Sequence, residues 1–432
     1  MGSIPTPTSL LQALSEQILI KATFLSDALS ADGLPQPSFD VDGPTNVVPP
    51  TASKAAIDAR NAVAEAAYKL FALVTGPSEL LPNMQAQYQT MFALRWITHF
   101  KVLELIPAEG SISYSELALK AKVPESQLKS IARMAMTSYI LQEPTPNHVA
   151  HSASSIMFVN NENMLHWAGF MFGASIPTAE AMVEATEKWP GSVRKTETAY
   201  NVAFNHDLPF FDHLSQSPTL TAQFSGYMKS VTSGQGTDLV HLLKGFDWAS
   251  LPEDALVVDV GGSTGHATYA LAEAYPQLKF EIQDLEPVTK NGIEILKTKS
   301  EEIQSRVSYR AHSFFDAQPV SGANVYMLRM IIHDWPDVEA IKIFSNLIPA
   351  LGPNSKIIIM DTVLPNPGQI PATKERVIRV RDLTMRQVFN AKERSTDDWE
   401  EILRSTDSRL RLESVRQPEG SHMSLMSIGL EN

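Results

Sequence analysis

The sequence predicts an α/β fold in its C-terminal half, with a doubly wound Rossmann-like sheet, and an all-α N-terminal half. Two patterns carry this prediction. From residue 256 onward, five short apolar runs alternate with helical stretches, which is typical of parallel strands that helices cover on both faces. Earlier in the chain, apolar residues recur at helical spacing, as in residues 9–32 and 53–75.

The expected strands of the sheet share short, continuous apolar sequences. They lie at residues 256–260, 279–285, 307–315, 324–332 and 356–364. Two further runs stand close together near the C-terminus, at 411–416 and 423–430. Their spacing predicts an antiparallel hairpin at one edge of the sheet.

The N-terminal half contains a linker and a small module. Residues 33–50 hold five prolines between the first two predicted helices, which indicates an extended linker. A helix–turn–helix pattern at 113–139, followed by a polar turn, predicts a winged-helix-like module. Its second helix offers only Lys129 and Arg133, too few cations for a DNA-binding surface.

These patterns divide the chain into three parts. We expect an N-terminal helix with its proline-rich linker at 1–52, a helical domain at 53–235 and the α/β domain at 236–432. Aromatic residues gather in the last part of the helical domain, where they fill a core or line a pocket.

Composition excludes several classes of function. The net charge of −13 argues against nucleic acid as a partner, because phosphate binding needs a basic surface. The absence of cysteine excludes disulfides, thiolate metal sites and a cysteine nucleophile, and we expect no metal site. No window approaches the roughly 18 apolar residues of a membrane span, and the N-terminus lacks the pattern of a signal peptide. We therefore expect a cytoplasmic protein.

A glycine-rich turn is the strongest functional signal. Asp259 lies near the end of a predicted strand, and Gly261 and Gly262 follow before a helix begins near His266. Glycines let the backbone approach a ligand closely, and a helix N-terminus offers free N–H groups. The sequence Gly-Gly-Ser-Thr-Gly differs from the dinucleotide pattern, so a ligand other than a dinucleotide is expected.

Two further polar residues follow predicted strands. Asp284 ends the second strand, where a carboxylate accepts hydrogen bonds from both hydroxyls of a ribose or merely caps the next helix. His333 follows the fourth strand and is either a general base or a structural histidine. Because the carboxyl ends of parallel strands share one edge, we expect both residues near Asp259.

Together, the GGSTG loop, the Gln-Asp-Leu sequence at 283–285 and the His-Asp-Trp sequence at 333–335 resemble the O-methyltransferase superfamily of natural-product enzymes, in its fungal branch. The resemblance covers essentially the whole chain and implies S-adenosyl-L-methionine as cofactor. It implies a cofactor site formed by Asp259, Gly261, Gly262, Asp284, Leu285, Ser313, Phe314 and Arg329. Ser313 departs from the pattern, because the family usually has aspartate before the paired phenylalanines.

The resemblance also implies a reaction and an assembly. In the family's methyltransferases, His333 would deprotonate a substrate hydroxyl, Glu393 would hold this histidine and Asp361 would assist. The N-terminal helices would form a homodimer and help to close the partner's pocket. The substrate would be a small natural-product intermediate.

Some fungal proteins of this architecture are pericyclases, and this sequence resembles them too. They dehydrate pyridone alcohols and direct hetero-Diels–Alder or Alder-ene reactions of the quinone methides, with S-adenosylmethionine retained but not consumed. Ser313 favours this interpretation. In such an enzyme, Thr232, Asp337 and His166 would bind a substrate carbonyl through hydrogen bonds. Each has an alternative role: Thr232 and Asp337 cap helices, and His166 belongs to the core.

We interpret the chain as such a pericyclase. The alternative is an S-adenosylmethionine-dependent O-methyltransferase acting on a polyketide or phenolic hydroxyl, which the intact set of His333, Glu393 and Asp361 suits. A second alternative is a non-catalytic partner protein. The intact glycine loop and His333 argue against it.

Overall fold

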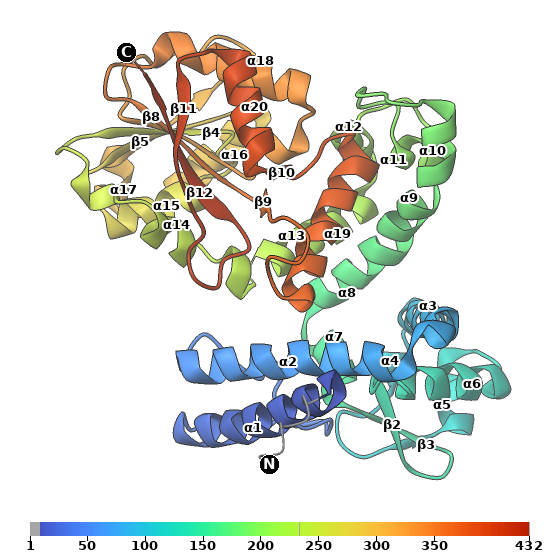
Figure 1. Cartoon of the computed structure of the whole chain (residues 1–432). Coiled ribbons are helices and arrows are strands. Elements are labelled where there is room, and N and C mark those ends of the chain that lie inside the picture. The colour runs from blue at the N-terminus through green and yellow to red at the C-terminus, as the bar shows by residue number, and fades with distance from the viewer. Residues whose placement is uncertain (1–8, 233, 432) are drawn as a thin grey trace, which may run out of the picture. The chain divides into compact units, whose positions relative to one another are not determined.

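The computed structural model describes residues 9–232 and 234–431, which form two compact units (Figure 1). The first unit comprises the described residues up to Ala174, with Ser217–Ser230 and Pro371–Thr373. The second comprises Ser175–Gln216, Val231–Ile370 and the described residues from Lys374 onward. Residues 175–216, which we assigned to the middle domain, thus group with the α/β domain.

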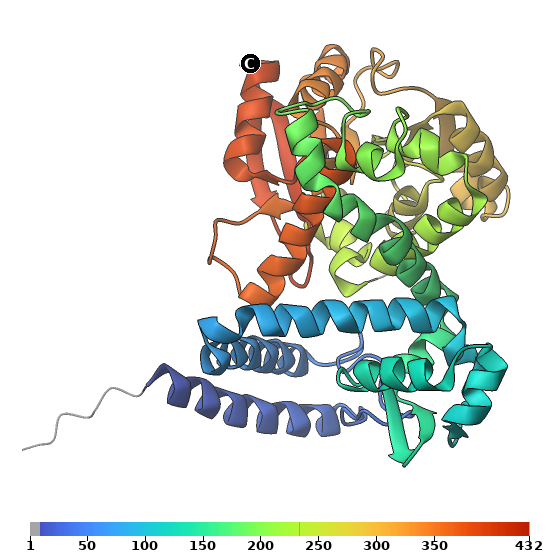
Figure 2. The same cartoon turned by 90° about the vertical axis from the view of Figure 1, so that its right-hand side faces the viewer.

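The first unit is mostly helical. Its elements are α1 (Leu10–Ala31), α2 (Lys54–Thr75), α3 (Leu80–His99), α4 (Val102–Leu105), β1 (Ile112–Ser113), α5 (Tyr114–Ala121), α6 (Glu125–Met136), β2 (Leu141–Thr145), β3 (His148–His151), α7 (Ala153–Asn160), α8 (Glu162–Phe170) and most of α13 (Pro218–Thr232). Helices α1 and α2 confirm the two predicted N-terminal helices and lie side by side (Figure 2). Ser9 and Ser53 cap their first turns.

The predicted helix–turn–helix pattern corresponds to α5 and α6. The hairpin of β2 and β3 follows, and β1 pairs with β3 on its other side. Leu117 and Leu128 of the two helices are fully buried in a common core with Val149 of β3. The winged-helix class itself stays a prediction.

The second unit is built around a sheet whose order, within the described residues, is β11-β12-β8-β7-β4-β5-β6. Its strands are β4 (Leu256–Val260), β5 (Lys279–Asp284), β6 (Val307–Ala311), β7 (Val325–Arg329), β8 (Lys356–Asp361), β11 (Leu410–Arg416) and β12 (Ser424–Leu430). The strands from β8 to β6 are parallel, and β12 and β11 are antiparallel. The chain thus has the predicted Rossmann-like α/β fold with an antiparallel edge hairpin.

Helices complete this unit. They are α9 (Ile176–Glu180), α10 (Met182–Lys188), α11 (Ala199–Phe204), α12 (Phe210–Ser215), α14 (Val240–Gly245), α15 (His266–Ala274), α16 (Glu286–Leu296), α17 (Glu301–Arg306), α18 (Asp337–Leu347), α19 (Ala372–Phe389) and α20 (Thr396–Thr406). A short strand pair, β9 (Val363–Leu364) and β10 (Arg394–Ser395), lies outside the main sheet.

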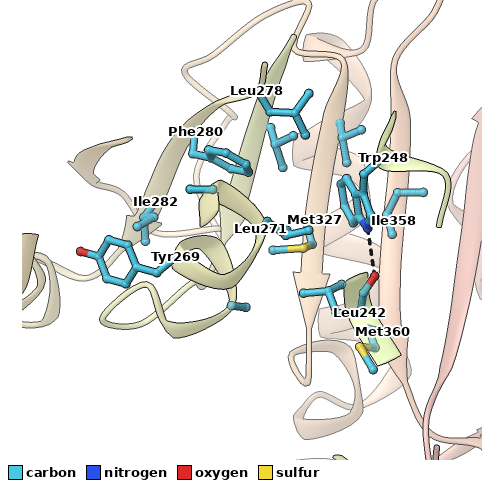
Figure 3. Close-up of a cluster of buried hydrophobic side chains, with 14 of the residues drawn as sticks. Leu242, Trp248, Tyr269, Leu271, Leu278, Phe280, Ile282, Met327, Ile358 and Met360 are labelled. Atoms are coloured by element: carbon cyan, nitrogen blue, oxygen red, sulfur yellow. Dashed lines mark hydrogen bonds between the residues drawn. The ribbon is translucent and has the colours of Figure 1, made fainter. Parts of the chain in front are cut away.

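Alternate residues of each central strand enter opposite cores, since side chains of a strand point alternately to the two faces. Val257 and Ile358 pack beneath α14 and α15, where Trp248 donates its indole N–H to the Leu242 carbonyl at 2.9 Å (Figure 3). Val258 and Ile359 pack beneath α18 and α20 on the other face. Burial on both faces explains why these strands are continuously apolar.

Four strands end earlier than predicted: β5 by one residue, and β6, β7 and β8 by three or four. β6 ends at Ala311, and residues 312–315 form a turn. β7 ends at Arg329, because Met330 adopts a φ of +55° that turns the chain out of the sheet. His333 therefore lies in a short 3₁₀ turn, Ile332–Asp334, rather than on the strand.

Candidate active site

The turn after β4 requires its glycines. Gly261 has a φ of +74°, and its amide and that of Gly262 both donate to the Gln283 carbonyl, at 2.8 and 3.1 Å. A Cβ at position 262 would lie 2.5 Å from the Asp259 carboxyl carbon, closer than real side chains approach. The turn thus packs backbone directly against the end of β4 and leaves its outer side to a ligand.

Asp259 is a buried carboxyl group beneath this turn. It accepts a hydrogen bond from the Thr268 hydroxyl at 2.6 Å, from the first turn of α15. Burial raises the pKa of Asp259 to about 6, although the Thr268 bond and the charge of Arg329 oppose this rise.

Asp284 is held in one orientation at the end of β5. Its two carboxylate oxygens accept the amides of Ser263 at 2.8 Å and Leu285 at 2.7 Å. Each oxygen keeps a further lone pair for another donor. The side chain of Leu285 is largely exposed beside it.

The segment after β6 forms a tight turn that ends in aromatic rings. The Ser313 hydroxyl accepts the Phe315 amide at 3.3 Å, and the Ser313 carbonyl accepts the Asp316 amide at 2.9 Å. The Phe314 ring lies 5.0 Å from the Phe315 ring and 5.4 Å from the Trp335 ring. At the position where the resemblance implies an aspartate, the Ser313 hydroxyl therefore forms a turn.

Arg329 is the last residue of β7, next to β4 in the sheet. Its guanidinium donates to the Thr237 carbonyl at 3.0 Å. Burial lowers its pKa, while the charges of Asp259 and Asp361 act in the opposite direction. Arginine keeps its charge under such conditions, so Arg329 is a fixed cation between two buried carboxyls.

His333 and Glu393 form the central polar pair of the site. The imidazole Nδ1 donates to the Glu393 carboxylate at 3.0 Å, and Nε2 lies 3.6 Å from the Asp334 carboxylate. The His333 side chain is only 12% exposed. Burial alone would lower the pKa of His333, but the negative charges of Asp361, Glu393 and Asp334 outweigh it and raise this pKa.

The parallel pairing of β9 with β10 brings Glu393 to this place. Glu393 directly precedes β10, and its amide donates to the Asp382 carboxylate of α19 at 3.1 Å. Asp361, the last residue of β8, lies just before β9. A small strand pair thus joins two acids that are 32 positions apart in the sequence.

Asp361 is a buried acid at the end of β8. It is fully buried, and neither carboxylate oxygen has a hydrogen-bond partner among the residues that the structure describes. Burial raises its pKa to about 7, against the opposing charge of His333. A carboxyl group in this state binds a proton readily at neutral pH.

Arg394 is a buried residue of this site that the sequence did not reveal. Its buried guanidinium donates to the carbonyls of Ile332 at 3.0 Å and Trp335 at 2.8 Å, and to the Asp337 carboxylate at 2.7 Å. It therefore fixes both ends of the turn that carries His333. The residue follows Glu393 in a polar Lys-Glu-Arg sequence, and nothing in that pattern indicated burial.

Asp337 begins α18 as the counter-ion of this arginine. Its second oxygen also lies 3.3 Å from the Lys392 ammonium, and the side chain is 44% exposed. These contacts assign it a structural role in addition to the helix start that its sequence position suggested.

The other two predicted substrate residues, His166 and Thr232, stay predictions. His166 belongs to the first unit, where its ring packs on the backbone of α13 at Gly226 and its Nε2 lies 3.9 Å from Glu162. Thr232 ends α13, and its side chain lies outside the described part of the chain.

The described residues contain neither a metal-binding cluster nor a membrane-spanning helix. No group of three or more histidine or acidic side chains that could hold a metal ion occurs in them. None of their helices combines the length and the apolar character needed to cross a membrane.

Comparison with known proteins agrees with this geometry. A family model for the O-methyltransferase domain matches residues 190–407. O-methyltransferase aurJ of Gibberella zeae is 64% identical over the full length of both chains. O-methyltransferase VdtC of Byssochlamys spectabilis is 48% identical over 96% of each chain.

Solved structures share the fold at low identity. The structure of LepI in complex with S-adenosylmethionine has a TM-score of 0.69 at 23% identity and covers 96% of this chain and all of that one. OxaC in complex with sinefungin and meleagrin has a TM-score of 0.71 at 19% identity, with the same coverage.

The family's cofactor is S-adenosyl-L-methionine, and the residues after β4 and β5 fit it. The glycines let the turn pack closely on Asp259 at the end of β4, just before the N-terminus of α15, and Asp284 is oriented with lone pairs to spare for ribose hydroxyls. The fold, the family model and the full-length relatives together show that this chain belongs to the fungal S-adenosylmethionine-dependent O-methyltransferase family.

Proposed function

We propose that this protein is an S-adenosylmethionine-dependent O-methyltransferase that acts on an acidic hydroxyl group of a small natural product. The observation that carries the proposal is the His333–Glu393 pair, buried at the carboxyl edge of the sheet beside the glycine turn. The names of its full-length relatives support the same reaction.

The residues of the chain perform the proton transfer. The Nδ1–H of His333 is bound to Glu393, which leaves Nε2 to take the proton of the substrate hydroxyl. Bound S-adenosylmethionine supplies an electrophilic methyl group. Glu393 and Asp361 stabilise the imidazolium that forms, because their carboxyl groups lie close to it in a site of low dielectric.

The surrounding acids also determine the pH at which His333 works. Because its pKa is raised, the ring is protonated in much of the resting enzyme at neutral pH. A base must be neutral to accept a proton. We therefore expect kcat/KM to rise with pH above neutrality, toward the pKa of His333.

For the cofactor we assign the residues that the resemblance named. Asp284 would accept hydrogen bonds from the ribose hydroxyls, with Leu285 beside the ring. The turn at Gly261 and Gly262 would face the methionine moiety above Asp259. Ser313 and Phe314 would lie toward the adenine, and Arg329 would contribute to the cofactor site from the end of β7, near Asp259.

Pericyclase activity is the second candidate. Its support is the fold shared with a structure described as a pericyclic reaction enzyme, with a TM-score of 0.70 at 23% identity, together with Ser313. Likeness at this identity concerns the fold alone. Asp337, one residue named for this activity, is engaged by Arg394, whereas the proton-transfer set is complete, and this favours methyl transfer.

Mass spectrometry of the products separates the two activities. The purified full chain is incubated with S-adenosylmethionine and two acceptors, a hydroxynaphthalene and a pyridone alcohol. We expect S-adenosylhomocysteine in equal amount to a methylated product, and loss of both in His333→Gln. The substitution His148→Gln, at an exposed position in the first unit, is the matched control. A dehydrated, cyclised pyridone without S-adenosylhomocysteine would establish the pericyclase instead, and the absence of any product would favour a non-catalytic partner.

We also propose that the protein forms a homodimer through its N-terminal helices. Helices α1, α2 and α3 expose large apolar side chains, including Leu19, Ile20, Phe24, Phe71, Val74, Leu80, Leu81 and Met84. Exposed apolar surface of this extent marks an association site. Light scattering is expected to give the mass of a dimer and, for a Leu81→Lys variant, a shift toward the monomer.

A further inference from the structure

Lys195 lies in the second unit, in the segment between α10 and α11, next to the aromatic rings of the candidate site. Its Nζ is 2.9 Å from the centroid of the Trp335 ring and 5.7 Å from that of Phe315. Trp335 follows His333 by two residues, and its ring packs on Phe315 at 4.6 Å. Lys195 thus places a positive charge on the aromatic wall directly beside the turn that carries the base.

The segment around Lys195 is held by the stretch of chain that also positions Glu393, the partner of the base His333. The Asn390 side-chain amide donates to the carbonyls of Arg194 at 2.8 Å and Glu197 at 3.0 Å. Arg194 and Glu197 also form an ion pair with each other at 3.0 Å. Since Asn390 precedes Glu393 by three residues, one stretch of chain positions both Glu393 and the segment of Lys195.

Among the described residues, no carboxylate pairs with Lys195 at this place. Its Nζ makes no ion pair within 4.0 Å in the described part of the chain, and the nearest charges that act on it are those of Glu339, Asp334 and Asp212 at longer range. Burial lowers its pKa to about 8, so the ammonium form still prevails at pH 7. A half-buried ammonium group on a ring face keeps donors that need an acceptor.

We propose that Lys195 binds the ionised oxygen of an aromatic hydroxyl substrate, whose ring lies against Trp335 and Phe315. The ammonium group stabilises a phenolate or enolate, the species formed when His333 removes the hydroxyl proton. Specificity for acidic aromatic hydroxyls over aliphatic alcohols follows, since only the former ionise beside a cation near neutral pH. The inference rests on the proposed function for the identity of the acceptor, and binding tests it independently of turnover.

The test compares the binding of 1-naphthol with that of its methyl ether, which cannot ionise. Isothermal titration calorimetry is run on the full chain saturated with S-adenosylhomocysteine, so no methyl transfer occurs. The wild type is expected to prefer the naphthol, and Lys195→Met should reduce this preference on the order of 10- to 100-fold, as for a lost charge-assisted hydrogen bond. Lys195→Arg, which keeps the charge, should restore most of it.

The matched control is Lys342→Met. Lys342 also lies over the Phe315 ring, at 5.4 Å, but is exposed, and its removal should leave the preference unchanged. The absorbance band of naphtholate supplies a second readout, because bound naphthol should ionise at lower pH in the wild type than in Lys195→Met. If Lys195→Met fails to fold, Lys195→Gln replaces it.

Three results would overturn the inference. They are an unchanged naphthol preference in Lys195→Met, no preference in the wild type, and a loss confined to the affinity for S-adenosylhomocysteine, which would place Lys195 in the cofactor site. Failure of the proposed function has a different signature, namely no S-adenosylhomocysteine with any acceptor while the Lys195-dependent preference persists.

Discussion

Replacing Glu393 by glutamine removes one negative charge from the His333 imidazole without changing the size of the side chain. The two groups are 3.0 Å apart. At an effective dielectric constant of about 20, their attraction is about 5 kcal/mol at most. Opposite charges at such distances shift a pKa by about 1–3 units. Asp361 and Asp334 remain, so we expect the pKa of His333 to fall by this smaller amount.

Two effects on the reaction follow from this single change. The rising limb of the kcat/KM profile should move to lower pH by about 1–3 units, because the ring becomes neutral earlier. The plateau rate should fall on the order of 10²- to 10³-fold, because the imidazolium loses its stabilising partner and the orientation of its ring.

The assay is S-adenosylhomocysteine formation between pH 5.5 and about 10. Histidine-labelled protein, titrated by nuclear magnetic resonance with His333→Gln for assignment, reports the same pKa without a substrate. Glu413→Gln removes a carboxylate that is paired with Lys356 at the sheet edge and serves as the control. A Glu393→Gln variant in which the His333 pKa is unchanged would refute the assignment of Glu393 as its partner.

Three more substitutions test the surrounding structure. Asp361 has a folded-state pKa above its unfolded value of 3.8, so its ionisation weakens the fold as pH rises from that value to about 7. We therefore expect Asp361→Asn to be more stable than the wild type at pH 8, by about 1–2 kcal/mol in denaturant unfolding, yet less active; equal stability would contradict the burial argument. Gly262→Ala should abolish S-adenosylhomocysteine binding in calorimetry, because its Cβ would meet the Asp259 carboxyl at 2.5 Å; intact binding would mean that the turn adapts. Asp337→Asn should lower the unfolding free energy by about 1–3 kcal/mol, since Arg394 loses its counter-ion, and a change in substrate KM alone would instead support a role in substrate binding.

The sequence predicted most of the fold because the signals are local. Glycine tolerates the positive φ at Gly261, so the turn after β4 is visible in the chain itself. Continuous apolar runs identified the parallel strands, because burial on both faces allows no polar alternation. Strand ends were less certain, and β7 ends before the predicted residue where Met330 leaves the sheet.

The site was predicted only where a residue type is tied to a strand end or a motif. His333 and Glu393 were paired by resemblance, and the structure places them 3.0 Å apart. Arg394 and Lys195 were missed because isolated cations in polar segments usually lie in solvent. Their contacts depend on pairs such as Arg394 with Trp335, 59 positions apart, which no local pattern encodes.

The sequence by itself therefore determined the fold class, the glycine turn and the carboxyl edge at which the polar residues gather. Only the tertiary structure decided how these residues interact. It buried Asp361 with no hydrogen-bond partner among the described residues, paired Asp337 with Arg394, and placed Lys195 on the Trp335 ring. The physical reason is that propensity and periodicity act over a few residues, whereas burial and charge pairing depend on segments that meet only when the sheet and its helices have packed.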